Sequence, residues 1–184
     1  KYTSILEFPE LENHAILIDS LSKRFSACGA RIGMIATKNK EVLQTVLKFA
    51  QQRLSPPTVE QLGAIAMFDV EEHYFTKVNT EYRKRRDTLV EGLNKIDGVK
   101  CHIPGGAFYC IVQLPVKDSD AFCQWMLSDF NYEGATVMMA PASGFYATDG
   151  KGKNEVRIAY VLNSIDLNNA IKCLEEGLKA YKEF

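Results

Sequence analysis

The chain has 184 residues, of which 46% are hydrophobic and 24% are charged. This balance is typical of a globular protein with a core and excludes a purely disordered chain. The 22 basic and 23 acidic residues nearly cancel, so charge offers no reason to expect nucleic acid or an anionic membrane as a partner. No apolar stretch approaches the roughly 20 residues that span a bilayer, and the N-terminus lacks the apolar core of a signal peptide. Because the first residue is not Met, we expect the chain to be part of a longer protein.

The first part of the chain predicts two short strands and an amphipathic helix. Residues 14–20 are apolar and rich in branched side chains, which is typical of a buried strand, and residues 31–37 predict a second strand. A polar connection that contains glycine, residues 21–30, separates them. Residues 40–52 place apolar side chains at helical spacing and predict an amphipathic helix.

Two further helices are expected after a proline-containing break at residues 55–57. Thr58, with Gln61 three residues later, predicts a capping box at the start of a helix that reaches about Val70. Residues 71–96 then predict one long helix, because their apolar side chains recur at helical spacing.

After Gly98, which tolerates the positive φ of a helix stop, the elements become shorter. Strands and helices interleave there, so the class is α/β or α+β. We expect strands over 99–103, 107–114, 135–140 and 155–162, and helices over 119–130 and 165–181.

The five cysteines form no C-x-x-C pair, and their number is odd. This pattern favours free thiols in a reducing cytosol over a disulfide framework, and it supports a metal site only weakly. We expect each cysteine to be a small buried hydrophobic residue.

Residues 20–33 combine groups that suit a phosphorylated aldehyde. The amine of Lys23 is a nucleophile toward an aldehyde when it is deprotonated. The hydroxyl of Ser20 and the guanidinium of Arg31, eight residues after the lysine, suit a dianionic phosphate. Two glycines flank the arginine and permit a tight turn near a ligand. Aldehyde capture beside phosphate binding is what pyridoxal 5′-phosphate (PLP) requires.

This segment resembles the Ser-x-Ser-Lys-(x)7-Arg-x-Gly signature of class I/II aminotransferases, which are fold-type I PLP enzymes of the aspartate aminotransferase type. The resemblance implies that Lys23 forms the Schiff base with the cofactor and acts as the catalytic residue. It implies that Ser20 and Arg31 bind the cofactor phosphate and that Ser22 is a supporting neighbour. The alternative is a surface lysine and an arginine in an ordinary ion pair.

Later segments resemble the same family in the same order. Residues 104–109 resemble its Pro-x-Gly-x-Phe-Tyr hairpin, and residues 141–146 resemble the loop before its last strands. The resemblance implies that Arg157 binds the α-carboxylate of the substrate, a role that suits its fork of N–H donors. An arginine on an edge strand could instead extend to solvent. The aromatic pairs that close these two segments could line a pocket or belong to the core.

The resemblance implies an α/β fold, namely the C-terminal part of the PLP-dependent transferase fold. Residues 1–70 would be the remnant of the PLP-binding large domain, 71–98 a bridging helix, and 99–184 the small C-terminal domain. The complete protein would be a cytoplasmic homodimer. It would transfer an amino group between an amino acid and a 2-oxo acid, with an aspartate- or alanine-type donor as the default.

The residues that this family uses around the pyridine nitrogen precede the lysine, so we expect this piece to be inactive alone. A β-lyase, decarboxylase or synthase on the same scaffold remains an alternative, because fold does not determine reaction. A further alternative is the aminotransferase-like effector domain of a transcription regulator. We expect no metal, nucleic acid or membrane partner.

Overall fold

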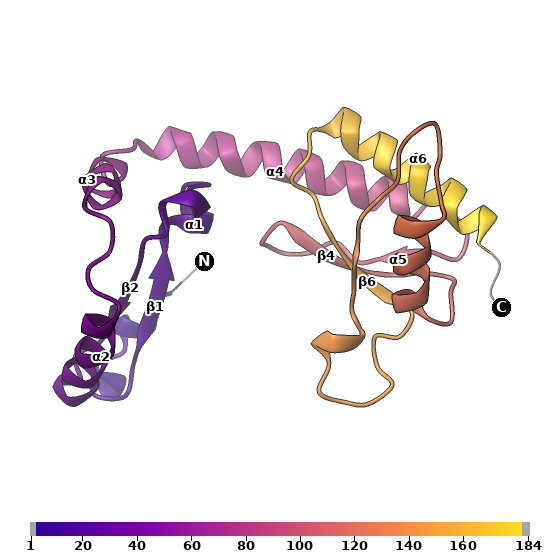
Figure 1. Ribbon diagram of the computed structural model, residues 1–184. Coiled ribbons are helices and arrows are strands. Elements are labelled where there is room, and N and C mark those ends of the chain that lie inside the picture. Colours follow the sequence, from indigo (N-terminus) through magenta and orange to yellow (C-terminus); the bar gives the residue numbers. More distant parts are fainter. Residues whose placement is uncertain (1–2, 182–184) are drawn as a thin grey trace. The chain divides into compact units, whose positions relative to one another are not determined.

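The computed structural model describes residues 3–181 and divides the chain into two compact units, the first ending at Glu72 and the second beginning at His73 (Figure 1). Helices and strands interleave in both, as the predicted α/β class requires. Across residues 3–181, no helix combines the length and the apolar character that crossing a membrane would need.

The first unit is built around a pair of strands followed by two helices. Its elements are η1 (Ile5–Glu7), η2 (Pro9–Leu11), β1 (Leu17–Ser20), α1 (Leu21–Arg24), η3 (Cys28–Ala30), β2 (Gly33–Ala36), α2 (Lys40–Gln52) and α3 (Thr58–Met67).

Strands β1 and β2 confirm the two predicted strands but are shorter, and they pair antiparallel with Ser20 opposite Gly33. The expectation that the first strand is buried is wrong, because Ile18 is 75% exposed; Met34 of β2 is likewise 51% exposed. The physical reason is the size of the sheet, since two strands alone cannot cover both of their faces.

Helix α2 spans the residues that periodicity predicted, and the Asn39 side chain caps it by accepting a hydrogen bond from the backbone N–H of Val42 at 3.1 Å. The predicted capping box at Thr58 is wrong. The cap residue of α3 is Pro57, and Thr58 already lies inside the helix, where its hydroxyl cannot act as the cap. Gln61 instead donates to the carbonyl oxygen before this cap, and the helix ends at Met67 rather than Val70.

The second unit contains a four-stranded antiparallel sheet and three long helices. Its strand order is β3-β4-β6-β5. Its elements are α4 (Glu72–Leu93, whose first residue still belongs to the first unit), β3 (Lys100–Cys101), β4 (Tyr109–Gln113), α5 (Ser119–Ser128), β5 (Ala140–Pro141), η4 (Ser143–Phe145), β6 (Glu155–Ala159) and α6 (Ser164–Ala180).

The elements β3, β4, α5 and β6 are each shorter than the predicted ranges 99–103, 107–114, 119–130 and 155–162, and two further differences have an identifiable cause. Helix α4 ends at Leu93, three residues early, because the Asn94 side chain exchanges hydrogen bonds of 2.8 and 2.9 Å with the backbone of Cys101. The strand expected over 135–140 is wrong except at its end. Only Ala140 and the proline after it pair with β6, while Ala135 forms an isolated bridge with Tyr132 instead of joining the sheet.

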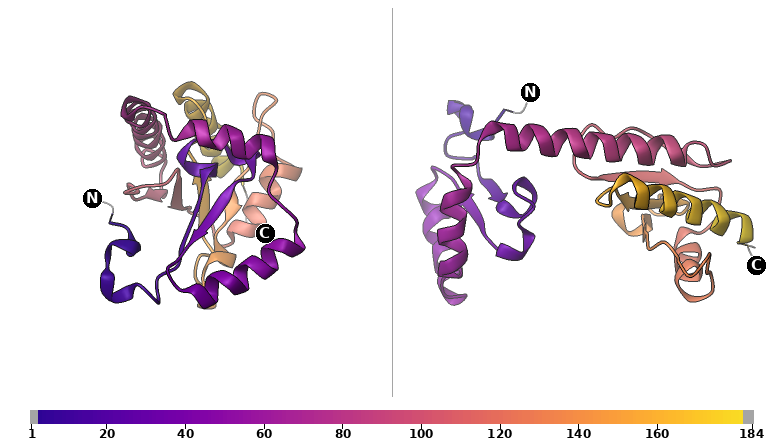
Figure 2. Two further views of the ribbon diagram at one scale, coloured as in Figure 1. Left: turned by 90° about the vertical axis from the view of Figure 1, so that its left-hand side faces the viewer. Right: turned by 90° about the horizontal axis from the view of Figure 1, so that it is seen from above.

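The core lies on one face of this sheet. Val112 and Val156 are fully buried there, and the helices contribute Leu89, Phe122 and Leu174. Helices α4 and α6 run side by side in the two further views (Figure 2). Alternation along β4 and β6 directs every second side chain to the opposite face, which these core residues leave open.

All five cysteines are free thiols. Four of them are buried, which confirms the prediction of small buried residues for Cys101, Cys110, Cys123 and Cys173. Cys28 is exposed, because it begins the short surface helix η3.

Candidate functional site

Ser20 ends β1 and starts α1. Its backbone is extended, and its hydroxyl oxygen accepts a hydrogen bond from the backbone N–H of Ser22 at 3.0 Å. The hydroxyl hydrogen of such a cap can still be donated to a ligand. The N–H of Leu21 donates to the carbonyl oxygen of Ile32 at 3.2 Å, which closes the connection between the strands directly beyond Ser20.

Lys23 and Arg31 both lie in this connection. Lys23 is exposed on α1, and Arg31 follows η3, which packs against α1. Arg31 adopts a left-handed backbone with φ of 55°, a conformation that costs a non-glycine residue on the order of 1 kcal/mol. Its Nη1 donates to the carbonyl oxygen of Cys28 at 2.9 Å, so most of its N–H donors are not used by this bond.

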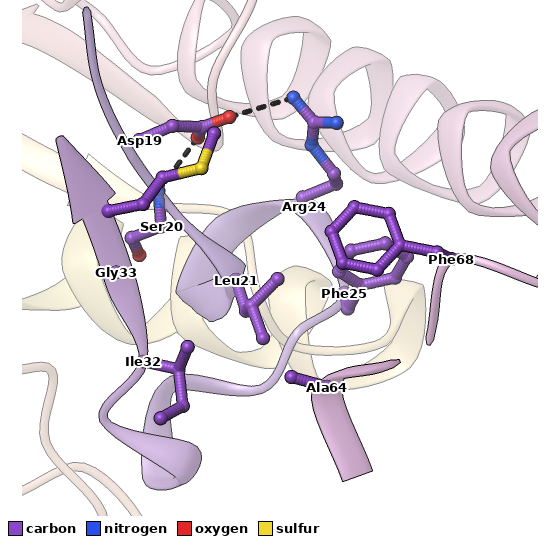
Figure 3. Close-up of a pocket in the computed structure, with 10 residues that line it drawn as sticks. Asp19, Ser20, Leu21, Arg24, Phe25, Ile32, Gly33, Ala64 and Phe68 are labelled. Carbon is purple, nitrogen blue, oxygen red and sulfur yellow. Dashed lines mark hydrogen bonds and ion pairs between the residues drawn. The ribbon is translucent and has the colours of Figure 1, made fainter. Parts of the chain in front are cut away.

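A cavity of about 200 Å³ opens beside Ser20 (Figure 3). Asp19 is tied there on both oxygens, because it pairs with Arg24 at 2.9 Å and accepts the N–H of Ser20 at 2.7 Å. The sequence analysis did not predict this ion pair. The opposite charges of Asp19 and Arg24, five positions apart, could have indicated it. The remaining lining residues are Leu21, Phe25, Ile32, Gly33, Met34, Ala64 and Phe68.

Arg31 lines a different cavity of about 390 Å³, together with Arg53 and residues 54–57. Gly33 lines both cavities, whereas Lys23 lines neither. The structure therefore brings the predicted cofactor residues into one connection but does not place the side chains of Lys23 and Arg31 in either of these cavities together.

Arg157 lies on an interior strand of the second unit, because β6 pairs with β4 on one side and β5 on the other. The edge-strand alternative is therefore wrong. The guanidinium carbon lies 4.5 Å from the ring centre of Tyr109 and 4.9 Å from that of Phe145. Within residues 3–181, no carboxylate forms an ion pair with Arg157, which is half-buried.

The four aromatic residues of the two C-terminal motifs divide between core and surface. Phe108 packs against the core, while Tyr109 and Phe145 flank Arg157. The hydroxyl of Tyr146 donates to Glu155 Oε2 at 2.5 Å, and this bond to a carboxylate raises the pKa of Tyr146. A cavity of about 460 Å³ on the open face of the sheet is lined in part by Tyr109, Tyr146 and Glu155.

The donor set around β1 and β2 fits PLP chemically. A serine hydroxyl and a guanidinium with N–H groups to spare suit a phosphate dianion. The amine of Lys23, in the same connection, is the group that an aldehyde requires. Ser20, Lys23 and Arg31 are thus the residues of this unit that could hold the cofactor.

Comparison with known proteins gives one consistent result. The family described as "Aminotransferase class I and II" matches residues 2–174. An aspartate aminotransferase of Sulfurisphaera tokodaii is 29% identical over all of this chain and 44% of its own length. A (5-formylfuran-3-yl)methyl phosphate transaminase of Methanocaldococcus jannaschii is 30% identical over all of this chain and 45% of its own length.

Solved structures agree with the sequence comparison. An aromatic aminotransferase from Pyrococcus horikoshii superposes with a TM-score of 0.80 at 26% identity, covering 97% of this chain and 47% of its own. The chain therefore spans less than half the length of the curated relatives and solved structures named here.

Proposed function

The chain belongs to the class I and II aminotransferases, and from this membership we propose that the protein transfers an amino group between an amino acid and a 2-oxo acid with PLP as cofactor. The structural observation that carries the proposal is the half-buried guanidinium of Arg157, which has two aromatic neighbours and no carboxylate partner among the described residues. Such a fork of donors suits the α-carboxylate that amino acids and 2-oxo acids share.

Each predicted site residue takes one role in this proposal. PLP, when bound, supplies an aldehyde that condenses with amines and a ring that withdraws electrons from the substrate. Ser20 and Arg31 hold its phosphate, with the Ser20 hydroxyl and the unused N–H groups of Arg31 as donors. The amine of Lys23 removes the proton from the substrate α-carbon and returns it as a general acid. Arg157 holds the substrate carboxylate during this transfer.

The finer assignments are also proposals. Residues 1–70 belong to the PLP-binding large domain, 71–98 form the bridging helix and 99–184 form the small domain. The donor is an aspartate- or alanine-type amino acid, and relatives named aspartate aminotransferase support the first of these. The intact protein is a homodimer, and its free thiols suit the cytoplasm.

The test is the variant Lys23→Ala in the intact protein, with Lys23→Arg as the matched control that keeps the charge but cannot act as a neutral amine. Both variants should lose at least about 10³-fold in transamination, because general acid–base catalysis contributes about that much. The absorbance of bound cofactor should also change in both.

Near-normal transamination by Lys23→Ala would refute the role of this residue. The 184-residue chain assayed without the rest of the protein should show no measurable transamination, since it spans less than half of its relatives. Activity of that chain alone would overturn the expectation that it is inactive.

A further inference from the structure

We propose that Tyr146 is a positioning residue for Arg157: it holds the carboxylate of Glu155, so that Arg157 stays unpaired until a substrate carboxylate binds. This inference rests on the proposed role of Arg157 as the carboxylate ligand. It explains why Glu155, an acidic residue on the same strand, does not itself pair with the guanidinium of Arg157.

Glu155 is the natural competitor for Arg157. The two residues are separated by one position on β6, so their side chains project from the same face of the sheet. Side chains two positions apart on a strand start about 7 Å from each other, which a glutamate and an arginine can bridge. Among the described residues no ion pair joins them, and Glu155 Oε2 instead accepts the hydroxyl of Tyr146 at 2.5 Å, which draws this oxygen toward the loop.

Two aromatic rings, rather than a carboxylate, contact the guanidinium of Arg157. Tyr109 and Phe145 lie 4.5 and 4.9 Å from it, inside the roughly 6 Å over which a cation is attracted to a ring face. Contacts of this kind restrain the plane of the guanidinium while its N–H groups stay available at the edge. The rings of Tyr109 and Phe145 therefore orient Arg157 without neutralising it.

The loop that carries Tyr146 is fastened to β6. The N–H of Ala142 donates to the carbonyl oxygen of Glu155 at 2.9 Å, and the N–H of Glu155 donates to that of Gly152 at 3.1 Å. Gly152 has a φ of +73°, and a Cβ there would lie 2.6 Å from Tyr146 Cδ2 and 2.7 Å from the oxygen of Ala142. Only glycine permits this close approach, which sets the ring of Tyr146 beside Glu155.

The central experiment removes the hydroxyl group of Tyr146. In the intact protein loaded with PLP, Tyr146→Phe frees Glu155 to pair with Arg157. The KM for the amino acid and the Kd for succinate, a carboxylate without an amino group, should each rise about tenfold, while kcat changes less than about twofold. The double variant Tyr146→Phe/Glu155→Gln should restore both constants, because a glutamine cannot neutralise the guanidinium.

Two controls separate positioning from general damage. Tyr132→Phe removes a hydroxyl that makes no hydrogen bond to the described residues, and it should leave the Kd for succinate unchanged. Glu155→Gln alone should bind succinate at least as tightly as the parent, and this result does not depend on the folding of Tyr146→Phe.

The outcomes distinguish this inference from the proposed function. An unchanged Kd for succinate in Arg157→Ala would refute the carboxylate role of Arg157 itself. If Arg157→Ala weakens succinate binding but Tyr146→Phe does not, the positioning role is overturned. The positioning role is also overturned if Glu155→Gln does not restore the Kd for succinate in Tyr146→Phe, or if Glu155→Gln alone weakens succinate binding.

Discussion

Gly177 lies where α6 meets α5, and its replacement by alanine tests how tightly the second unit is packed. A Cβ at this position would lie 2.5 Å from Met126 Sδ and 3.1 Å from Met126 Cε. Met126 is fully buried, so it has little room to move away. Gly177→Ala therefore sets a favourable backbone effect against an unfavourable contact.

The unfavourable contact with Met126 should outweigh the favourable backbone effect. Alanine is favoured over glycine by up to about 1 kcal/mol in a helix interior. Overpacking a core by a methyl group costs about 1–3 kcal/mol, and a contact roughly 1 Å too short lies toward the upper end of that range. We expect the free energy of unfolding of the second unit to fall by about 1–2 kcal/mol.

The assay is urea unfolding followed by the fluorescence of Trp125, which is the single tryptophan of the chain. Its ring centre lies 5.2 Å from that of Phe130, and both rings pack against the core of the second unit, so the fluorescence of Trp125 reports on this unit. With an m-value of about 1–2 kcal/mol per molar, the midpoint should fall by about 1 M urea. Gly105→Ala is the matched control, because a Cβ there meets no atom within 4 Å. A midpoint for Gly177→Ala equal to or above that of the parent would refute the reasoning.

Two further predictions concern charge. Arg157→Lys keeps the charge but loses the fork, so the KM for the amino acid in steady-state assays should rise about 10- to 100-fold; an unchanged KM would count against carboxylate binding. Burial raises the pKa of the Cys123 thiol from 9.0 to about 11. The unfolded thiol ionises first, so the stability that this thiol contributes is present below pH 9 and is lost between pH 9 and 11. The urea midpoint should fall less steeply over that range in Cys123→Ala than in the parent, and parallel curves would contradict the assignment.

Local pattern was sufficient for the long helices. The periodicity of residues 40–52 and 165–181 predicted α2 and α6 to within one residue, because an amphipathic helix makes its own backbone hydrogen bonds. The prediction of a strand over 135–140 was wrong because, unlike a helix, a strand depends on a partner elsewhere in the chain. A strand exists only where a partner accepts its ladder bonds, and β6 offers a partner only at Ala140 and Pro141.

For the candidate site, too, the sequence predicted some features and missed others. The spacing of Ser20, Lys23 and Arg31 was sufficient to recognise the family, which the match over residues 2–174 confirms. Spacing did not predict that Asp19 pairs with Arg24, because that contact depends on how α1 turns away from β1.

The sequence by itself therefore determined the presence of the long helices and the family, and it suggested the residues that could bind a cofactor and a carboxylate, since these depend on local periodicity and on residue type. Only the tertiary structure decided that Arg157 lies on an interior strand beside two aromatic rings and that the Tyr146 hydroxyl donates to Glu155. Those contacts join separate strands and loops of the second unit, and their partners are set by register and by the close approach at Gly152.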